Sequence, residues 1–412
     1  MKRVAYNRLS MLPSACVLSL MATVAWSQTL TWLGTPIGNT SLATAVSNDG
    51  MIIAGRAGTV LAGSLSADSL LWNRRTNTVQ QLSTDGGTVW MMTPDGNKIA
   101  ANENLSSPPH RAFIWTPEGK QYLPGYSAAA LCINRSGTLV GGGWNYGSGN
   151  RPILWDANTQ QIIFAESSLI GEMLGVSDDG SKLLLYTRSL RAKVWYRSSN
   201  TLVTLLPYQN DPYTLGFKLT PDGKVVVGTS GSIYNIWTGV GNNYRAAMWR
   251  EDNSWQVEPL ANLGGQRGIA YDIKGNTIVG FVSTPSGENR AVRWRLSTAT
   301  TQVEDLNQTY GALLSSGSRL RIAFGASYNE RFIVGVGYNA ATGREEAFLL
   351  DTRVCNRADV DGNGCIDDAD LLQVLFAFGA TDIDFWREDI NCDGVVDDAD
   401  LLQVLFGFGS GC

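Results

Sequence analysis

Histidine is nearly absent from this chain of 412 residues, whose one copy is His110. The sequence also has no Gly-x-Ser-x-Gly nucleophile motif, no ligand spacing typical of zinc and no glycine-rich phosphate loop. The usual signatures of serine hydrolases, zinc enzymes and nucleotide-binding enzymes are therefore missing. We interpret His110 as a surface loop residue. The sequence therefore favours a non-catalytic protein. The alternative is a glycosidase, because two carboxylates brought together from distant strands leave no local motif.

Long apolar runs are scarce as well. The run at the N-terminus, residues 12–26, is short, follows Lys2, Arg3 and Arg8, and ends in the small-x-small sequence Ala25-Trp26-Ser27. This pattern predicts a secretory signal over residues 1–27. No other stretch has the length of a membrane span. We therefore expect an exported bacterial protein, either secreted or held at the cell surface.

Basic clusters are missing, and the charge that is present is local. The whole chain has a formal net charge of −5, whereas residues 355–412 alone carry 13 acidic and 2 basic side chains. The rest of the chain is weakly basic and has no basic patch or stripe. A nucleic-acid partner is therefore not expected, and the acidity belongs to the C-terminal stretch.

The sequence does contain a repeat, which extends over residues 28–352. Each unit has a tight turn between two short strands and then a strand that ends in an aromatic residue. The turns lie at Asn48-Asp49-Gly50, Pro94-Asp95-Gly96, Arg135-Ser136-Gly137, Asp178-Asp179-Gly180, Pro221-Asp222-Gly223, Lys274-Gly275-Asn276 and Asn329-Glu330. The aromatic residues are Trp72, Trp115, Trp155, Trp195, Trp249, Trp294 and Phe348. Units of four short strands predict a mainly β fold, a seven-bladed β-propeller. An open sandwich or a β-solenoid is the alternative.

The two ends of the repeat region predict how the ring closes. The seventh unit stops at residues 347–350 without a fourth strand, whereas residues 29–34 form a fourth strand with no three before it. We expect the N-terminal strand to complete the last blade and to remove its open edge.

Residues 111–115, Arg-Ala-Phe-Ile-Trp, resemble the His-Ala-Phe-x-Trp motif of bacterial extracellular HAF repeats, with Arg in place of His. This resemblance implies export and little about chemistry.

Two of the long connections between strands are rich in aromatic residues. In a propeller, the connections from second to third strands and from one unit to the next emerge on the same face, which makes that face the candidate for binding. The candidate ligand-binding residues are Trp144, Tyr146, Tyr234, Trp237 and Tyr244. Exposed rings would stack on sugar rings or peptides. The alternative is that they fold back onto the strands.

The acidic C-terminal stretch contains one twelve-residue pattern twice, at residues 359–370 and 389–400. As in EF-hand calcium loops, side-chain oxygens stand at positions 1, 3, 5, 9 and 12, glycine stands at 6, and position 7 offers its carbonyl. The predicted ligands are Asp359, Asp361, Asn363, Cys365, Asp367 and Asp370 in one loop and Asp389, Asn391, Asp393, Val395, Asp397 and Asp400 in the other. We therefore expect two Ca²⁺ ions. Magnesium suits an all-protein oxygen set less well, and two acidic surface turns are the other alternative.

Residues 353–412 resemble the dockerin family, a tandem of two such loops that are each followed by one helix and closed by Asp at position 12. The resemblance implies calcium-dependent docking of the host protein onto cohesin domains, often in polysaccharide-degrading assemblies. The family's partner-contact positions 10 and 11 are Asp368-Ala369 and Asp398-Ala399 here, instead of the Ser-Thr common in cellulosomal members. The resemblance thus points to a cohesin-like or cell-surface partner.

The segment after each loop predicts a helix with more apolar residues than one face can hold. The predicted buried face of the first helix consists of Leu371, Val374, Leu375 and Phe378. The apolar residues off that face in the two repeats are Leu372, Phe376, Leu402 and Phe406. They either form a partner surface or close the core against Phe385 and Trp386.

Four of the six cysteines lie in the C-terminal stretch, and export predicts that they form disulfides. Four cysteines allow three pairings. Of these we favour Cys355–Cys412, which clasps the two ends, together with Cys365–Cys392. Cys132 lies in an apolar strand and is predicted to be a buried free thiol.

Three functions are compatible with these patterns. In the favoured one, the propeller recognises a glycan or a protein, and the dockerin-like region attaches it to a partner or a surface assembly through calcium. In the second, the propeller is a glycosidase or lyase that this region recruits. In the third, the region is only a structural cap, which the short connection at residues 351–356 favours.

Overall fold

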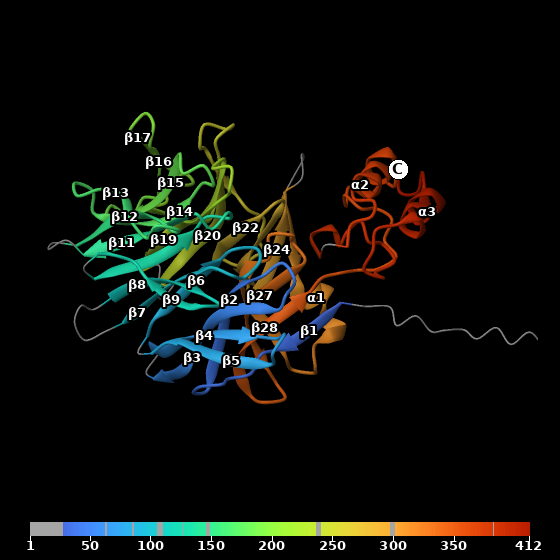
Figure 1. Ribbon diagram of the computed structural model, residues 1–412, viewed down its shortest axis with the longest axis horizontal. Coiled ribbons are helices and arrows are strands. Elements are labelled where there is room, and N and C mark those ends of the chain that lie inside the picture. Colours follow the sequence, from blue (N-terminus) through green and yellow to red (C-terminus); the bar gives the residue numbers. More distant parts are fainter. Residues whose placement is uncertain are drawn as a thin grey trace, which may run out of the picture.

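The computed structural model describes residues 28–412 except 62–63, 85, 105–109, 126, 146–148, 236–239, 297–300 and 382. The predicted secretory signal, residues 1–27, lies outside the described residues. Strands dominate the described chain, and the two longer helices lie near its C-terminus, beside the sheets (Figure 1). The chain is thus mainly β, as its repeat predicts. Among the described residues, we find no helix with the length and apolarity needed to cross a membrane.

Within the described residues, five sheets each contain four strands that pair antiparallel in chain order. The first two consist of β6 (Thr88–Met92), β7 (Ile99–Asn104), β8 (His110–Thr116) and β9 (Gly119–Tyr122), then β10 (Ala128–Ile133), β11 (Leu139–Asn145), β12 (Asn150–Asp156) and β13 (Ile162–Ala165). The next two consist of β14 (Gly171–Val176), β15 (Lys182–Thr187), β16 (Lys193–Tyr196) and β17 (Thr201–Thr204), then β18 (Tyr213–Leu219), β19 (Val225–Asn235), β20 (Val240–Arg250) and β21 (Val257–Pro259). The fifth consists of β22 (Gly268–Lys274), β23 (Thr277–Ser283), β24 (Asn289–Arg295) and β25 (Gln302–Asp305), and is followed by the short helices α1 (Leu306–Thr309) and η1 (Gly311–Leu313).

A further sheet has eight strands in two halves. One half consists of β2 (Thr40–Val46), β3 (Ile52–Leu61), β4 (Ser64–Asn73) and β5 (Thr78–Ser83), and the other of β26 (Arg319–Ala326), β27 (Phe332–Asn339), β28 (Arg344–Asp351) and β1 (Thr29–Trp32). One parallel bridge between Thr40 and Glu345 joins the halves. β1 pairs antiparallel with β28, from Thr29 opposite Asp351 to Trp32 opposite Phe348. This confirms that the N-terminal strand supplies the missing fourth strand of the last unit.

The sheets surround a central cavity, which makes the fold β-propeller-like. The first strand of every four-strand set lines this cavity, and each such strand has a β-bulge at the same point. The extra residues at these bulges are Thr44, Trp90, Leu131, Leu174, Phe217, Tyr271 and Phe324. All seven residues line the cavity. A bulge re-aims one side chain relative to the regular alternation of a strand, so the inner strands present an additional residue toward the centre.

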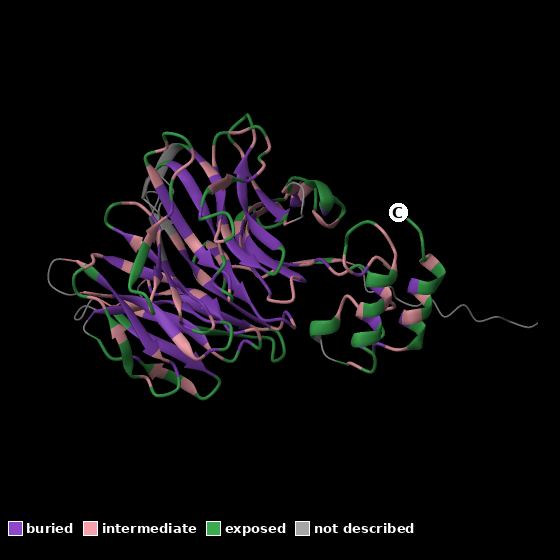
Figure 2. Cartoon of the chain, turned by 90° about the horizontal axis from the view of Figure 1, so that it is seen from above, coloured by how far each residue is buried: buried purple, intermediate pink, exposed green. Residues whose placement is uncertain are grey.

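The repeated landmarks of the sequence form recurring hydrogen bonds, some within a turn and some between a sheet and the segment before it. In the turn after β2, the Ser47 hydroxyl donates to the Asp49 carboxylate, and equivalent bonds recur in the turns after β6, β14 and β18. Four repeated tryptophans donate their indole N–H group to a backbone carbonyl. The carbonyl lies in the segment that precedes their own sheet in the chain, and for Trp72 this segment follows β1. These pairs are Trp72 to Leu33, Trp155 to Pro124, Trp249 to Leu206 and Trp294 to Ala261. The buried tryptophans therefore have a structural role. Most of the strands in the sheets are buried (Figure 2).

Residues 353–412, hereafter the C-terminal region, contain α2 (Asp368–Phe376), η2 (Ile383–Phe385) and α3 (Asp398–Gly407). Their small core is formed by Val360, Val374, Ala377, Ile390, Val396 and Val404. Backbone hydrogen bonds cross between the repeats, because Val396 of the second loop pairs with residues 379–380 and Ile366 of the first loop pairs with residues 409–410. Each loop is thus held by the segment that follows the helix of the other repeat.

The favoured disulfide pairing is wrong, and these crossed contacts explain why. Cys355 bonds to Cys392 and Cys365 to Cys412, with Cα atoms 5.7 and 4.6 Å apart. The chain end returns to the first loop and the start of the region lies beside the second, so each end is joined to a loop rather than to the other end. Cys132 is a buried free thiol, as predicted.

Candidate calcium centre and partner surface

Each predicted calcium loop ends at a helix N-terminus with the same capping arrangement. Asp367 caps α2 by accepting the Ala369 N–H at 2.8 Å, and Asp370 accepts the Asp367 N–H at 3.0 Å. Asp397 and Asp400 repeat these bonds at α3, at 2.8 and 2.9 Å. Such a capping box fixes the last two predicted ligands of each loop at the start of the helix.

Three predicted ligands of the first loop converge. Asp359, Asp361 and Asp370 each offer a carboxylate oxygen, and these oxygens lie within 4.8 Å of one another. Asp370 is fully buried, and its Oδ1 accepts the N–H groups of Val360 and Asp361 at 2.7 and 3.0 Å. Clustered oxygens held this way suit a hard cation such as Ca²⁺, which takes six to eight oxygen ligands.

The middle of both loops has the same succession of turns. The side-chain oxygen at position 3 accepts the N–H of position 5, in Asp361 to Asn363 at 2.9 Å and in Asn391 to Asp393 at 2.8 Å. The oxygen at position 5 then accepts the N–H of position 7, at 2.7 Å from Cys365 and at 3.0 Å from Val395. At position 6, Gly364 and Gly394 have φ of +96° and +98°, a conformation that favours glycine. The backbone therefore follows the same path in both loops.

Asp389, the first predicted ligand of the second loop, has a partner that sequence reasoning missed. Arg353 lies just after β28, and its guanidinium donates to Asp389 Oδ2 at 2.6 Å. Asp389 Oδ2 also accepts the Gly394 N–H at 3.0 Å, whereas Asp389 Oδ1 is buried and has no hydrogen-bond partner among the described residues. An ion pair that orients one carboxylate oxygen and leaves the other unsatisfied fits a metal ligand with an outer-shell partner.

The electrostatics of the second loop point the same way. Burial raises the pKa of Asp400, and the neighbouring Asp389 carboxylate raises it further, whereas backbone N–H groups oppose the shift. Gathering carboxylates is therefore costly without a compensating cation. The donor set consists of carboxylate, amide and carbonyl oxygens, which fits Ca²⁺ or Mg²⁺ and does not resemble a zinc site.

The four apolar residues predicted to lie off the buried helix face are exposed. The exposed fractions are 48% for Leu372, 86% for Phe376, 45% for Leu402 and 85% for Phe406. The residues at loop positions 10 and 11, Asp368, Ala369, Asp398 and Ala399, are exposed as well. The prediction of a buried face was wrong for Leu375 and Phe378, which are 45% and 52% exposed, because the small core accepts only Val374 and part of Leu371. Both helices thus present apolar side chains to solvent.

The segment between the two repeats contacts the strand sets instead of closing the helical core. The Trp386 indole N–H donates to the Asn329 carbonyl at 2.8 Å, and Arg387 lies 3.3 Å from the Glu330 carboxylate. Asp384 accepts a hydrogen bond from Asn48. These contacts lie at the turns after β2 and β26, the end of the strands opposite the long connections. Sequence reasoning missed these contacts because Asn48, Asn329 and Glu330 are distant in the chain from the segment that they contact.

The predicted loop aromatics do not form one described surface. Trp144 is half-buried and packs against a core cluster, and Tyr244 is 3% exposed and lines the central cavity. Tyr146 and Trp237 lie outside the described residues, as does the side chain of Tyr234. Where the rings are described, they fold back onto the strands, which was the alternative interpretation.

Comparisons with known proteins show similarity in structure alone. No protein-family model matches the chain, and no curated protein matches it. A TolB structure from Acinetobacter baumannii has a TM-score of 0.40 and 11% identity, over 65% of this chain and 65% of that one. A TolB structure from Agrobacterium tumefaciens has a TM-score of 0.41 and 13% identity, over 63% of this chain and 91% of that one. The chain thus matches about two thirds of the length of the first structure.

Proposed function

We propose that this chain is a secreted bacterial calcium-binding protein, in which a seven-bladed β-propeller is followed by a dockerin-like region, residues 353–412, that attaches it to a cohesin-like or cell-surface partner. One observation carries the proposal. Two loops have the same pattern of oxygen side chains and form equivalent internal hydrogen bonds. Each loop leads into a helix with exposed leucine and phenylalanine side chains. Bound calcium would order the loops, and the ordered loops would fix the positions of the helices.

Two further observations support the architecture and the compartment. The first strands of all four-strand sets line one cavity, which is what closure of a propeller requires. Two disulfides in the C-terminal region suit an oxidising compartment, in agreement with the predicted secretory signal. The propeller would present a glycan- or protein-binding face on the side of the long connections, because the C-terminal region contacts the opposite side.

The structural-cap hypothesis rests on an observation of its own. Trp386 and Arg387 tie the C-terminal region to the turn after β26, and Asp384 ties it to the turn after β2. A cap needs these contacts but has no use for apolar side chains that face solvent, such as Phe376 and Phe406. The enzyme hypothesis has less support, because the described lining of the central cavity contains one carboxylate, Asp272, rather than a pair.

A pull-down with the chain of residues 28–412 tests the attachment function. The bait is exposed to the organism's secreted and envelope proteins in calcium and in EDTA. We expect a protein that is retained in calcium only, and retained no longer by the double variant F376S/F406S. The variant I162S/I163S removes two residues that are 41% and 43% exposed on β13, and serves as the matched control. Retention unaffected by F376S/F406S, or none at all, would favour the cap.

A further inference from the structure

The central cavity has a volume of about 440 Å³, which falls in the range of small-molecule sites. Its described lining includes seven aromatic residues contributed by several sheets: Trp90, Phe217, Tyr244, Tyr271, Phe281, Phe324 and Tyr328. Most other lining residues are aliphatic. The lining also contains four cationic side chains, Arg56, Lys218, Arg267 and Lys274, against one carboxylate, Asp272. An apolar cavity with an excess of positive charge is the feature that needs an explanation.

Two of the charged residues break a pattern that the other units keep. The residue directly after the bulge is uncharged in five inner strands: Ala45, Met91, Cys132, Gly175 and Gly325. In β18 and β22, which lie next to each other, the same position holds Lys218 and Asp272. Five units therefore form the same bulged strand without a charge, and the fold itself does not require one here.

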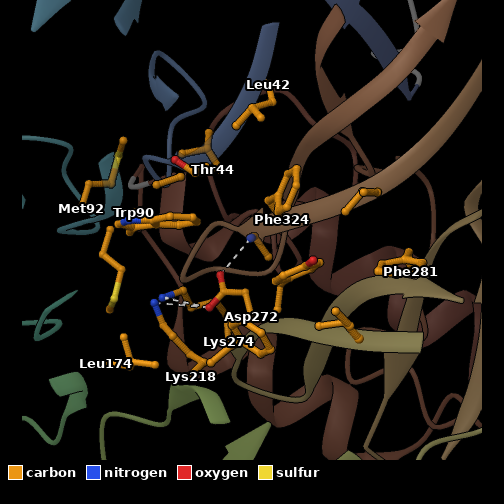
Figure 3. Close-up of a pocket in the computed structure, with 18 of the residues that line it drawn as sticks. Leu42, Thr44, Trp90, Met92, Leu174, Lys218, Asp272, Lys274, Phe281 and Phe324 are labelled. Carbon is orange, nitrogen blue, oxygen red and sulfur yellow. Dashed lines mark hydrogen bonds and ion pairs between the residues drawn. The ribbon is translucent and has the colours of Figure 1, made fainter. Parts of the chain in front are cut away.

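The charges are buried and incompletely compensated. Lys218, Asp272 and Lys274 are between 4% and 7% exposed. The two ammonium groups lie 3.4 and 3.7 Å from the same atom, Asp272 Oδ1 (Figure 3). The two Asp272 oxygens already accept the N–H groups of Ile273 and Ala326, each at 3.0 Å. Two ammonium groups thus share one carboxylate, and among these three side chains one positive charge remains in excess.

Burying charges in this way is expensive unless something returns the lost solvation. Desolvation by burial lowers the pKa of Lys218 and of Lys274, and the Asp272 carboxylate only partly offsets this effect. The ammonium of Lys274 also lies 3.5 Å from the centre of the Tyr328 ring. A second anion beside the two lysines would complete the charge balance.

We propose that the central cavity binds a small monocarboxylate with a flat apolar body, whose carboxylate contacts Lys218 and Lys274 and whose body packs against Trp90, Tyr271 and Phe324. Figure 3 shows both lysine side chains converging on Asp272, with Trp90 and Phe324 beside the same space. The Tyr271 ring contacts Phe217 on one side and Phe324 on the other, at ring-centroid distances of 5.1 and 4.9 Å, which gives a continuous aromatic wall.

The apolar lining decides between classes of anion. A sugar acid or inorganic phosphate would bring several hydroxyl or phosphate oxygens to a wall whose one hydrogen-bonding group is the Tyr271 hydroxyl, at a cost for each unsatisfied group. An aromatic carboxylate buries its ring against other rings and presents one charge to the lysines. Toward the end of the strands with long connections, Arg56 Nε and Asn289 Oδ1 are buried and have no hydrogen-bond partner among the described residues. These atoms would contact a polar substituent at the far end of a longer ligand.

This site goes beyond the proposed attachment function and does not depend on the C-terminal region. The test uses residues 28–412 with titration calorimetry and thermal unfolding. The probes are benzoate and 2-naphthoate, with benzamide as the neutral analogue and glucuronate and inorganic phosphate as anions without an apolar body. We expect the aromatic carboxylates to bind and to raise the unfolding temperature, in calcium and in EDTA alike. Benzamide should bind at least about tenfold more weakly, because it lacks a charge-assisted contact.

Two variants should change the affinity for the aromatic carboxylates in opposite directions. K218M places at this position the residue that the equivalent strand β6 carries, Met91, and leaves a neutral Lys274–Asp272 pair, so carboxylate affinity should fall about tenfold or more. D272N leaves two lysines without a counter-ion, so affinity should rise. K193M replaces a lysine outside the cavity and should bind like the parent chain.

Several results would overturn the proposal. They are no binding of either aromatic carboxylate at millimolar concentration, equal binding of benzamide, binding of glucuronate or phosphate as tight as that of benzoate, or unchanged affinity in K218M. If K218M does not fold, D272N still decides the matter, because a site that does not use the lysines predicts no tighter binding in that variant.

Discussion

The C-terminal loops and the central cavity face opposite electrostatic problems. The loops gather carboxylates, such as Asp359, Asp361 and Asp370, near the surface of a small region with a minimal core. The cavity gathers lysines around one carboxylate inside a large apolar fold. In both places the excess of one charge sign is costly by itself, and a ligand of the other sign would remove that cost.

The comparison also separates two ways of building a site. All predicted ligands of one calcium loop fall within twelve consecutive residues, so the loop depends on local turns and one helix cap. The cavity is assembled from inner strands that are distant in sequence, and a bulge in each strand sets which side chain points inward. Removing the ligand should therefore unfold or loosen the first site and leave the second almost unchanged in shape.

The largest effect is expected from removing the closing carboxylates of both loops. The variant D370A/D400A should lower calcium affinity by more than about 100-fold, because each Asp is a predicted ligand and also holds the loop by accepting backbone N–H groups. Titration calorimetry measures the affinity, and calcium should no longer raise the unfolding temperature of the C-terminal region.

The exposed Asp398, at loop position 10, provides the matched control for this experiment. D398A removes a carboxylate from the same loop without removing a predicted ligand, so calcium affinity should stay within about threefold of the parent. An equal loss in D398A would mean that general negative charge, and not a built cage, attracts the cation.

A smaller effect is expected from removing one disulfide. Cys355 and Cys392 are 37 residues apart, and a loop of that length corresponds to about 3–4 kcal/mol of stabilisation in the chain-entropy model. C355S/C392S should therefore lower the stability of the C-terminal region and leave the unfolding of the strand sets unchanged, as followed by calorimetry in calcium. The control C132A alters the buried thiol in β10 and should do the reverse. Equal destabilisation of both parts by C355S/C392S would show that they unfold as one unit.

Much of the fold could be predicted from sequence because its signals are local. Turn residues such as Asp49-Gly50 and the periodic tryptophans mark each strand set, and the unpaired strand at residues 29–32 indicated its partner β28. The bulges could not be predicted, because a bulge depends on the pairing of two strands. The disulfide pairing failed for a similar reason, since it follows from the crossed contacts of Ile366 and Val396.

The candidate calcium site was predictable to the same extent, and the cavity was not. The spacing of oxygen ligands is written in one short stretch, whereas Arg353 as the partner of Asp389 requires the connection after β28 to pass the second loop. For the cavity, the available signal was a charge in an apolar inner strand, as in Phe217-Lys218-Leu219. Its meaning depends on Asp272 and Lys274, which stand more than 50 residues later along the chain.

The smallest expected effect concerns stability rather than binding, and it distinguishes the two regions by pH. Burial lowers the pKa of Lys218 below its ordinary value of 10.5, so between the lowered pKa and 10.5 the unfolded chain holds more protons than the folded one. Stability of the parent should therefore rise with pH through this window, and K218M should show a smaller rise. At neutral pH, K218M should be as stable as the parent or more stable by about 1 kcal/mol, because it removes the excess buried charge.

The other groups that face Lys218 allow this comparison. Lys274 has a pKa shift of the same sign and stays in both proteins, and burial raises the pKa of Tyr328 to about 12, so Tyr328 stays neutral in the window. Denaturant unfolding at several pH values from 7 to about 10 measures the difference, with K193M as control. Parallel pH profiles for K218M and the parent would mean that Lys218 is solvated in the folded protein, and the cavity would then have no charge excess for a carboxylate to balance.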